Sequence, residues 1–175
     1  MTTAPDRCKI RGTITLVHTR RDPETDAVRV LERRVVKNLI TQYGDQFYGE
    51  RASGIGAHTV PSGMKLGTGT TAVAKTGAGA ATVTYLTGSN RPFVGGFPAS
   101  SLEVAARRIE YQSFWDEGVA TSATIAEVML TNQDVLADDA SVVGDTIARH
   151  VFSPVIDKQA TDTLTITWAH DLEGV

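Results

Sequence analysis

The sequence predicts a mainly β protein: an antiparallel β-sandwich, jelly-roll-like or immunoglobulin-like, with one short helix near residues 38–52 and long Gly-rich loops. One observation is composition, because the 175 residues include 23 threonines together with many valines and isoleucines. β-branched side chains keep their preferred rotamers on a pleated surface and lose freedom in a helix. A second observation is that short segments of alternating polarity recur with turn residues between them, which is typical of sandwiches and barrels.

The length and composition indicate one domain. A chain of 175 residues falls within the usual size of a single domain, about 100–200 residues. Hydrophobic residues make up 41% of it, which is enough for a core and too many for a disordered chain. We therefore expect a single domain over residues 1–175, with a mobile N-terminal segment over residues 1–9.

The first two strands are predicted to form a hairpin. Residues 10–18 alternate between apolar and polar side chains, the pattern of a strand with one face in the core. A polar stretch with Asp22-Pro23 follows, a common turn initiator, and residues 28–36 are again rich in β-branched side chains. The alternation fails at Val30-Leu31 and at Val35-Val36, which indicates a β-bulge or a strand buried on both faces.

The helix is predicted from a capping residue and from spacing. Asn38 can accept hydrogen bonds from the free backbone N–H groups at a helix start. Apolar and aromatic side chains then recur at helical intervals, namely Leu39, Ile40, Tyr43, Phe47 and Tyr48. We expect this helix to end near Ser53 and to cover the open end of the sandwich with its aromatic side.

The middle of the chain differs from its second half in amino-acid composition. Residues 54–101 are rich in Gly, Ala, Thr, Ser and Pro, and hold two short strand-like runs at 64–66 and 83–86. Long loops of this kind often form interaction surfaces. Further strands are expected at 107–115, 124–130, 146–152 and 163–170, with a turn at 116–118 after the first of them.

Charge, hydropathy and cysteine content exclude several classes. The 17 Lys and Arg against 20 Asp and Glu give a net charge of -3, so we expect no general attraction to nucleic acid. No apolar run approaches the ~20 residues that span a bilayer, so we expect no membrane partner. Cys8 is the single cysteine, which excludes an internal disulfide and a CxxC zinc site.

One glycine-containing segment resembles a phosphate-binding loop. Gly69–Thr76 matches the pattern GxxxxGK[ST], except that Ala74 replaces the second glycine. Such a loop works when it opens a helix whose N-terminus faces the phosphate. Because Gly-Ala-Gly follows, which is a poor helix start, a surface loop is the favoured interpretation and we expect no cofactor.

Glu127 is the most unusual acidic residue, because it stands between Ala126 and Val128 in an apolar strand. A role as the acid or base of a small hydrolase is one interpretation. Buried carboxylates need partners, however, so an ion pair is favoured, with Arg107, Arg108 or Arg149. We predict that the protein is not an enzyme.

The histidines and a group of aspartates are weaker candidates. A metal centre built from His18, His150 and His170 would require these strand-end residues to converge in the fold. The acidic group does not fit the calcium-loop pattern, which favours a solvated loop over weak calcium binding; its members are Asp134, Asp138, Asp139 and Asp145. We predict no metal site.

Four segments in this order carry a family resemblance. They are Lys37-Asn-Leu-Ile-Thr41 after a hairpin, Leu66-Gly-Thr-Gly69 after a Gly-rich loop, Thr124–Leu130, and the tail Arg149–Lys158 with Asp162–Trp168. Over residues 10–170 this arrangement resembles small virion proteins of tailed bacteriophages, found as capsid decoration, neck or tail accessory components. The resemblance implies a β-sandwich that packs against other virion subunits without catalysis. The Ala- and Gly-rich run 72–81 departs from the polar, proline-containing loop that relatives often carry.

Together these features predict a noncatalytic structural protein of the virion, assembled in the host cytoplasm. A capsid decoration protein that binds and bridges shell subunits is favoured, with a tail or neck accessory role as the alternative. Its expected partners are the major capsid protein or tail subunits, and further copies of itself in a homo-oligomer such as a trimer. The alternative from another class is a carbohydrate-binding module for host-surface attachment that uses an exposed Trp115 or Tyr85 as a stacking platform.

The segment Arg91–Ala99 holds the predicted intersubunit contact. Aromatic side chains anchor interfaces as well as cores, and prolines flank two of them here. The predicted contact residues are Phe93, Phe97, Pro92 and Pro98. Local packing of this loop onto the domain is the alternative.

Overall fold

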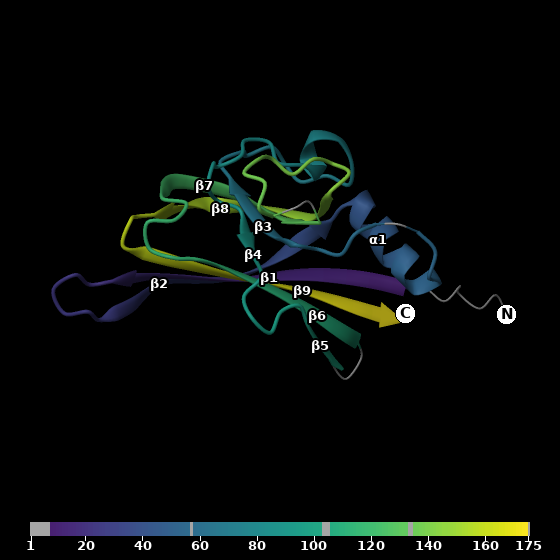
Figure 1. The fold of residues 1–175 in the computed structure, drawn as a ribbon, viewed down its shortest axis with the longest axis horizontal. Helices are drawn as coiled ribbons and strands as arrows, with labels where there is room; N and C mark the ends of the chain where they lie inside the picture. The colour runs from purple at the N-terminus through teal and green to yellow at the C-terminus, as the bar shows by residue number, and fades with distance from the viewer. Residues whose placement is uncertain (1–7, 57, 103–105, 133–134, 175) are drawn as a thin grey trace.

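The computed structural model describes residues 8–56, 58–102, 106–132 and 135–174, and shows nine strands and one α-helix in them (Figure 1). The strands are β1 (Cys8–Arg21), β2 (Val28–Ile40), β3 (Gly63–Gly67), β4 (Arg91–Pro92), β5 (Ala99–Leu102), β6 (Ala106–Trp115), β7 (Ser122–Thr131), β8 (Thr146–Lys158) and β9 (Asp162–Gly174). The helix is α1 (Gln42–Ser53), and η1 (Gly77–Ala80) is a single 3-10 turn. The mainly β fold with one helix is confirmed.

The strands lie in one sheet with the order β4-β3-β7-β8-β2-β1-β9-β6-β5, and all neighbours are antiparallel. The sheet curls so that its two ends approach each other. Phe93, directly after β4, forms an antiparallel bridge with Ser113 of β6, and Val94 N–H donates to the Gln112 carbonyl at 2.8 Å. Since one curled sheet encloses the core, the jelly-roll or immunoglobulin type of sandwich is not confirmed.

The core lies inside this curl. Along β9, Leu164, Ile166 and Trp168 are fully buried, while the threonines between them are only partly buried. The same alternation in β6 buries Trp115 completely. Each large apolar side chain that is fully buried contributes about 1.5–3 kcal/mol to folding. The predicted alternation of β6 and β9 is therefore confirmed as the basis of the core.

The hairpin of β1 and β2 is confirmed, including its irregularity. His18 pairs with Glu32, whereas Thr19 pairs with Val30, so Leu31 is an extra residue in β2. This is the bulge predicted at Val30-Leu31. The second candidate position, Val35-Val36, stays in register with β1.

Helix α1 begins later than predicted. Asn38 is not its cap, because β2 continues through Ile40 and Thr41 caps the helix from an extended backbone conformation. The Thr41 hydroxyl accepts a hydrogen bond from Gly44 N–H at 3.0 Å and donates to the Ile147 carbonyl at 3.1 Å. The predicted end is confirmed at Ser53, where Gly54 follows with a φ of 69°, a left-handed conformation that favours glycine.

Replacing Thr41 by alanine is expected to lower the free energy of unfolding by about 1–2 kcal/mol, because both the cap and a buried hydrogen bond are lost. Urea denaturation measures this change. Thr41→Ser keeps the hydroxyl and is the matched control. Equal stability of the alanine and serine variants would contradict the assignment of the cap.

The structure confirms one of the two short strand-like runs predicted in the middle of the chain. β3 contains the run at 64–66, but residues 83–86 form only an isolated bridge between Tyr85 and Gly67. Of the expected mobile segment, residues 1–7 lie outside the described residues, and Cys8 and Lys9 begin β1. In the part of the chain that the structure describes, no helix is long and apolar enough to cross a membrane.

Candidate functional site

The outer half of the β1–β2 hairpin projects beyond the rest of the molecule (Figure 1). Along its length β2 pairs with β1 on one side, but on the other side its ladder pairs join β8 only at Leu39 and Ile40. Arg34 reaches β8 with its side chain, donating to the Pro154 carbonyl. Beyond Arg34, residues 28–33 show no strand partner on this side among the described residues, and we call them the open edge of β2.

Apolar side chains line this region on the outer face of the sheet. Val28, Val30 and Val35 are 62%, 58% and 64% exposed. Their partners in β1 are Arg21, Thr19 and Thr15, which all alternate with the buried residues of that strand. The bulge at Leu31 shifts the alternation by one residue, so it brings Val28 and Val30 to the same face as Val35.

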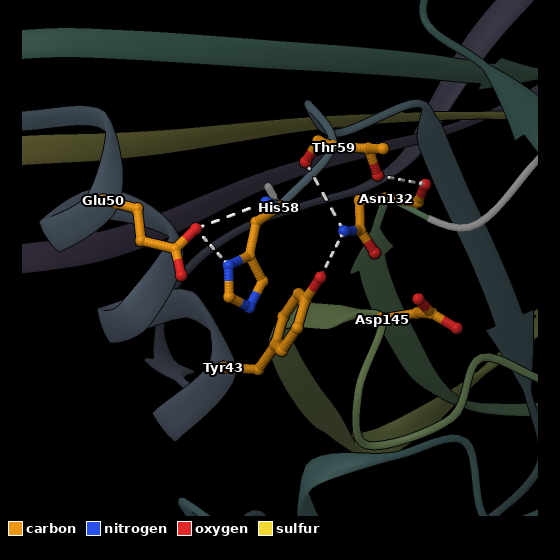
Figure 2. A pocket seen from close by; sticks show the side chains of 6 residues that line it. All are labelled: Tyr43, Glu50, His58, Thr59, Asn132 and Asp145. Atoms are coloured by element: carbon orange, nitrogen blue, oxygen red, sulfur yellow. Dashed lines mark hydrogen bonds and ion pairs between the residues drawn. The ribbon is translucent and has the colours of Figure 1, made fainter. Parts of the chain in front are cut away.

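A separate pocket of about 480 Å³ lies beside α1 (Figure 2). Tyr43 and Glu50 come from the helix, and His58 and Thr59 from the loop after it. Two further lining residues come from the connection between β7 and β8, namely Asn132 directly after β7 and Asp145 directly before β8. Four segments of the chain therefore supply this pocket.

Asn132 is the centre of the hydrogen bonds in this pocket. Its Nδ2 donates to the Tyr43 hydroxyl oxygen at 2.6 Å and to the Thr59 carbonyl at 3.4 Å. Its Oδ1 is buried and has no hydrogen-bond partner within the described residues. Figure 2 shows this oxygen directed into the space between Tyr43 and Asp145. An unpartnered buried acceptor costs about 1–3 kcal/mol, which a ligand donor would offset.

The pocket has a negative electrostatic character. Glu50 pairs with His58 through Nδ1, and this hydrogen bond holds the pKa of Glu50 below its usual value. Burial raises the pKa of Tyr43, and the charges of Asp145 and Glu50 act in the same direction. Tyr43 therefore keeps its proton and offers a hydroxyl donor next to an amide oxygen and a carboxylate. This set suits a ligand with hydroxyl or ammonium groups.

The predicted contact segment lies where the sheet ends meet. Pro92 and Pro98 are exposed, whereas Phe93 and Phe97 are partly buried. The ring of Phe93 packs against Tyr111 with centroids 5.4 Å apart, so Phe93 also serves the core. The role of these residues in an intersubunit contact stays a prediction.

Glu127 forms an ion pair, as the sequence predicts, and Arg149 is its partner. Both side chains are fully buried, and Arg149 Nη2 lies 2.7 Å from Glu127 Oε2. The carboxylate also accepts the backbone N–H groups of Gly69 at 3.2 Å and Thr84 at 2.9 Å. This fully buried carboxylate therefore anchors the loop 69–84 to β7 and β8.

The phosphate-loop-like segment has the geometry of a surface loop. Lys75 extends its ammonium group to Asp45 at 2.5 Å, and the short turn η1 takes the place of the required helix. The favoured loop interpretation of this segment therefore agrees with the structure.

The histidines do not converge. His18 contacts Asp162 at 2.8 Å, His170 contacts the Tyr48 hydroxyl at 2.5 Å, and His150 packs against Phe152. The described residues contain no group of three metal-ligating side chains.

The acidic group also has separate partners. Asp138 accepts from the Tyr85 hydroxyl at 2.6 Å, and Asp139 pairs with Lys65 at 2.9 Å. Asp145 lines the pocket beside α1, and Asp134 lies outside the described residues.

Trp115 cannot serve as the exposed stacking platform expected for a carbohydrate-binding module. It is fully buried, and its ring N–H donates to the Ser89 carbonyl at 2.6 Å.

Comparisons with protein-family models, with curated proteins and with solved structures find no match to this chain. The surfaces described above are therefore the features of the molecule that bear on its function. Sequence reasoning missed the pocket beside α1, because its residues carry no shared motif. It also missed the open edge of β2, although the predicted bulge was a local sign of it.

Proposed function

We propose that this protein is a noncatalytic structural component of a tailed-phage virion, with capsid decoration as the favoured role and a tail or neck accessory position as the alternative. In this role it binds and bridges neighbouring subunits. The open edge of β2 is the observation that supports assembly. The resemblance of the four sequence segments supports the phage setting.

The physical basis is strand addition. Backbone N–H and C=O groups along an open strand edge pair readily with a strand of another chain. The exposed valines beside this edge would add apolar contact, worth roughly 25 cal/mol for each Å² buried. A projecting hairpin reaches a neighbour without disturbing the core of the domain.

Replacing Val30 by lysine is expected to weaken binding to particles lacking this protein by about tenfold or more, because it places charge in the apolar contact. The melting temperature should stay nearly unchanged, since the side chain is largely exposed. Cosedimentation with such particles measures binding. Val60→Lys is the matched control, because Val60 is 61% exposed and lies in a loop outside the hairpin. Equal binding of both variants would contradict the role of the hairpin.

Replacing Phe97 by serine is expected to abolish particle binding and to leave the melting temperature nearly unchanged, if the segment Arg91–Ala99 is a second contact. The same cosedimentation assay and a thermal melt measure the two effects. A collapse of the melting temperature would assign Phe97 to the core.

Gold-labelled antibody on negatively stained particles tests the position. Label over the head is expected for a decoration protein. Label at the neck or tail would support the accessory role. Intact and disrupted particles that both stay unlabelled would contradict the virion role.

The second candidate function is carbohydrate binding at the host surface, now favoured by the pocket beside α1 in place of Trp115. The pocket offers the Tyr43 ring and hydroxyl, the unpartnered Asn132 Oδ1 and the Asp145 carboxylate to sugar hydroxyl groups. A glycan array with the wild type and with Asp145→Asn tests it. Binding that Asp145→Asn removes and the control Asp138→Asn retains would support this function, and an array without binding would exclude it.

A further inference from the structure

A wedge-shaped cavity lies at the base of the β1–β2 hairpin, at the end away from the turn, where the two strands separate. We call it the wedge. The two strands pair as far as Gly12 and Asn38. Beyond this point Leu39 and Ile40 pair with β8, whereas residues 8–11 of β1 keep only β9 as a partner among the described residues. The wedge has a volume of about 730 Å³, within the range of about 300–1,000 Å³ that ligand sites occupy.

The closed end of the wedge holds an unpartnered amide. Nδ2 and Oδ1 of Asn38 are both buried without a hydrogen-bond partner in the described part of the chain. The side chain lies over Gly12, where an added Cβ would come within 1.8 Å of Oδ1. Gly12 is thus needed to make room for the amide. A donor and an acceptor side by side match the C=O and N–H of a peptide group.

The rim of the wedge carries excess positive charge. Lys9, Arg11, Lys37 and Lys75 line it, against Asp171 and Glu173, and Lys75 is paired with Asp45 from outside the wedge. Both acidic residues already have arginine partners, Asp171 with Arg108 at 2.8 Å and Glu173 with Arg11 at 3.1 Å. Lys9 and Lys37 have no ion pair among the described residues, so the site attracts negative charge.

We propose that this wedge binds an extended acidic segment of a partner protein, which adds as a strand to the edge of β1 at residues 8–11. Side chains of the segment alternate between two environments. Those directed inward meet Ile10 and Ile40, and those directed outward meet Lys9 and Lys37. Residues 8–11 have no strand partner on this side among the described residues, and the nearby Asn38 amide is unpartnered there, which together favour a peptide over a small anion. This site is separate from the open edge of β2, and it does not depend on a virion role.

Fluorescence anisotropy with labelled peptides of about seven residues, a usual strand length, tests the proposal. The first peptide alternates glutamate with valine, and the second alternates lysine with valine. We expect the glutamate peptide to bind and the lysine peptide not to bind. Lys37→Glu and Asn38→Leu should each weaken binding of the glutamate peptide by about tenfold or more. Arg33→Glu is the control, because it makes the same charge reversal on the outer face of β2 outside the wedge.

Hydrogen exchange of the complex locates the peptide. New protection of the backbone amides at residues 8–11 is the expected result. Protection at residues 28–33 instead would place the peptide on the open edge of β2 and overturn the proposal. Absence of binding by the wild type, or equal binding of the two peptides, would overturn it as well. Thermal melts of the variants show that any loss of binding does not come from unfolding.

Discussion

Replacing Glu127 by alanine is expected to lower the free energy of unfolding by about 3–5 kcal/mol, because it leaves a buried guanidinium without a counter-ion. Arg149 is fully buried and also donates to the Thr71 carbonyl at 2.9 Å. The lost carboxylate additionally accepts backbone N–H groups of the loop 69–84, including Val83 N–H at 3.1 Å. The substitution therefore removes an ion pair and releases a loop in one step.

Urea denaturation measures the change in the free energy of unfolding caused by Glu127→Ala. Glu173→Ala is the matched control, because it breaks an ion pair with Arg11, whose side chain is 57% exposed. An exposed pair contributes at most about 1 kcal/mol. The double variant Glu127→Leu with Arg149→Met should be more stable than Glu127→Ala, since it leaves no buried charge. A loss for Glu127→Ala no larger than for Glu173→Ala would contradict this account.

His170 is expected to make the protein sensitive to mild acid. Burial lowers the pKa of His170 to about 3, against about 6.5 in an unfolded chain. Between these values the unfolded state binds more protons than the folded state. The free energy of unfolding should therefore fall by about 1.4 kcal/mol for each pH unit below about 6.5. The Tyr48 hydroxyl contacts Nδ1 of the neutral His170 ring, and Tyr48 is itself buried. A positive charge on His170 would therefore stay in a buried site.

Urea denaturation between about pH 7 and about pH 4.5 measures this slope in the wild type and in His170→Gln, which cannot titrate. The slope should be smaller in the variant. His58→Gln is the control, because His58 lies at the surface pocket beside α1. The lower limit of this pH range lies above the pH at which Asp162 takes up a proton in the folded state. Burial alone would raise the pKa of Asp162, but hydrogen bonds led by the one from Arg20 lower it to about 2, so its own loss of stability begins in more acidic solution. Equal slopes in the wild type and in His170→Gln would contradict the prediction.

Local patterns in the chain predict much of the sheet. The alternation over residues 163–170 identifies β9 and its buried face, because successive side chains of a strand point to opposite sides whatever its neighbours are. The interrupted alternation at Val30-Leu31 likewise identifies the bulge. The helix start differs from the prediction. Asn38 and Thr41 are both good capping residues, and the pairing of β2 with β1 and β8 selects Thr41.

Local sequence patterns were enough to predict the strand-rich class, the hairpin, the end of the helix and a buried carboxylate that needs a partner. The folded arrangement was needed to identify Arg149 as that partner, to show that one curled sheet encloses the core, and to locate the pocket beside α1 and the wedge. The difference arises from distance along the chain, because alternation and capping act between residues that are near neighbours in the sequence. Ion pairs, sheet curling and cavities depend on which distant segments meet, and short sequence patterns carry no signal for that choice.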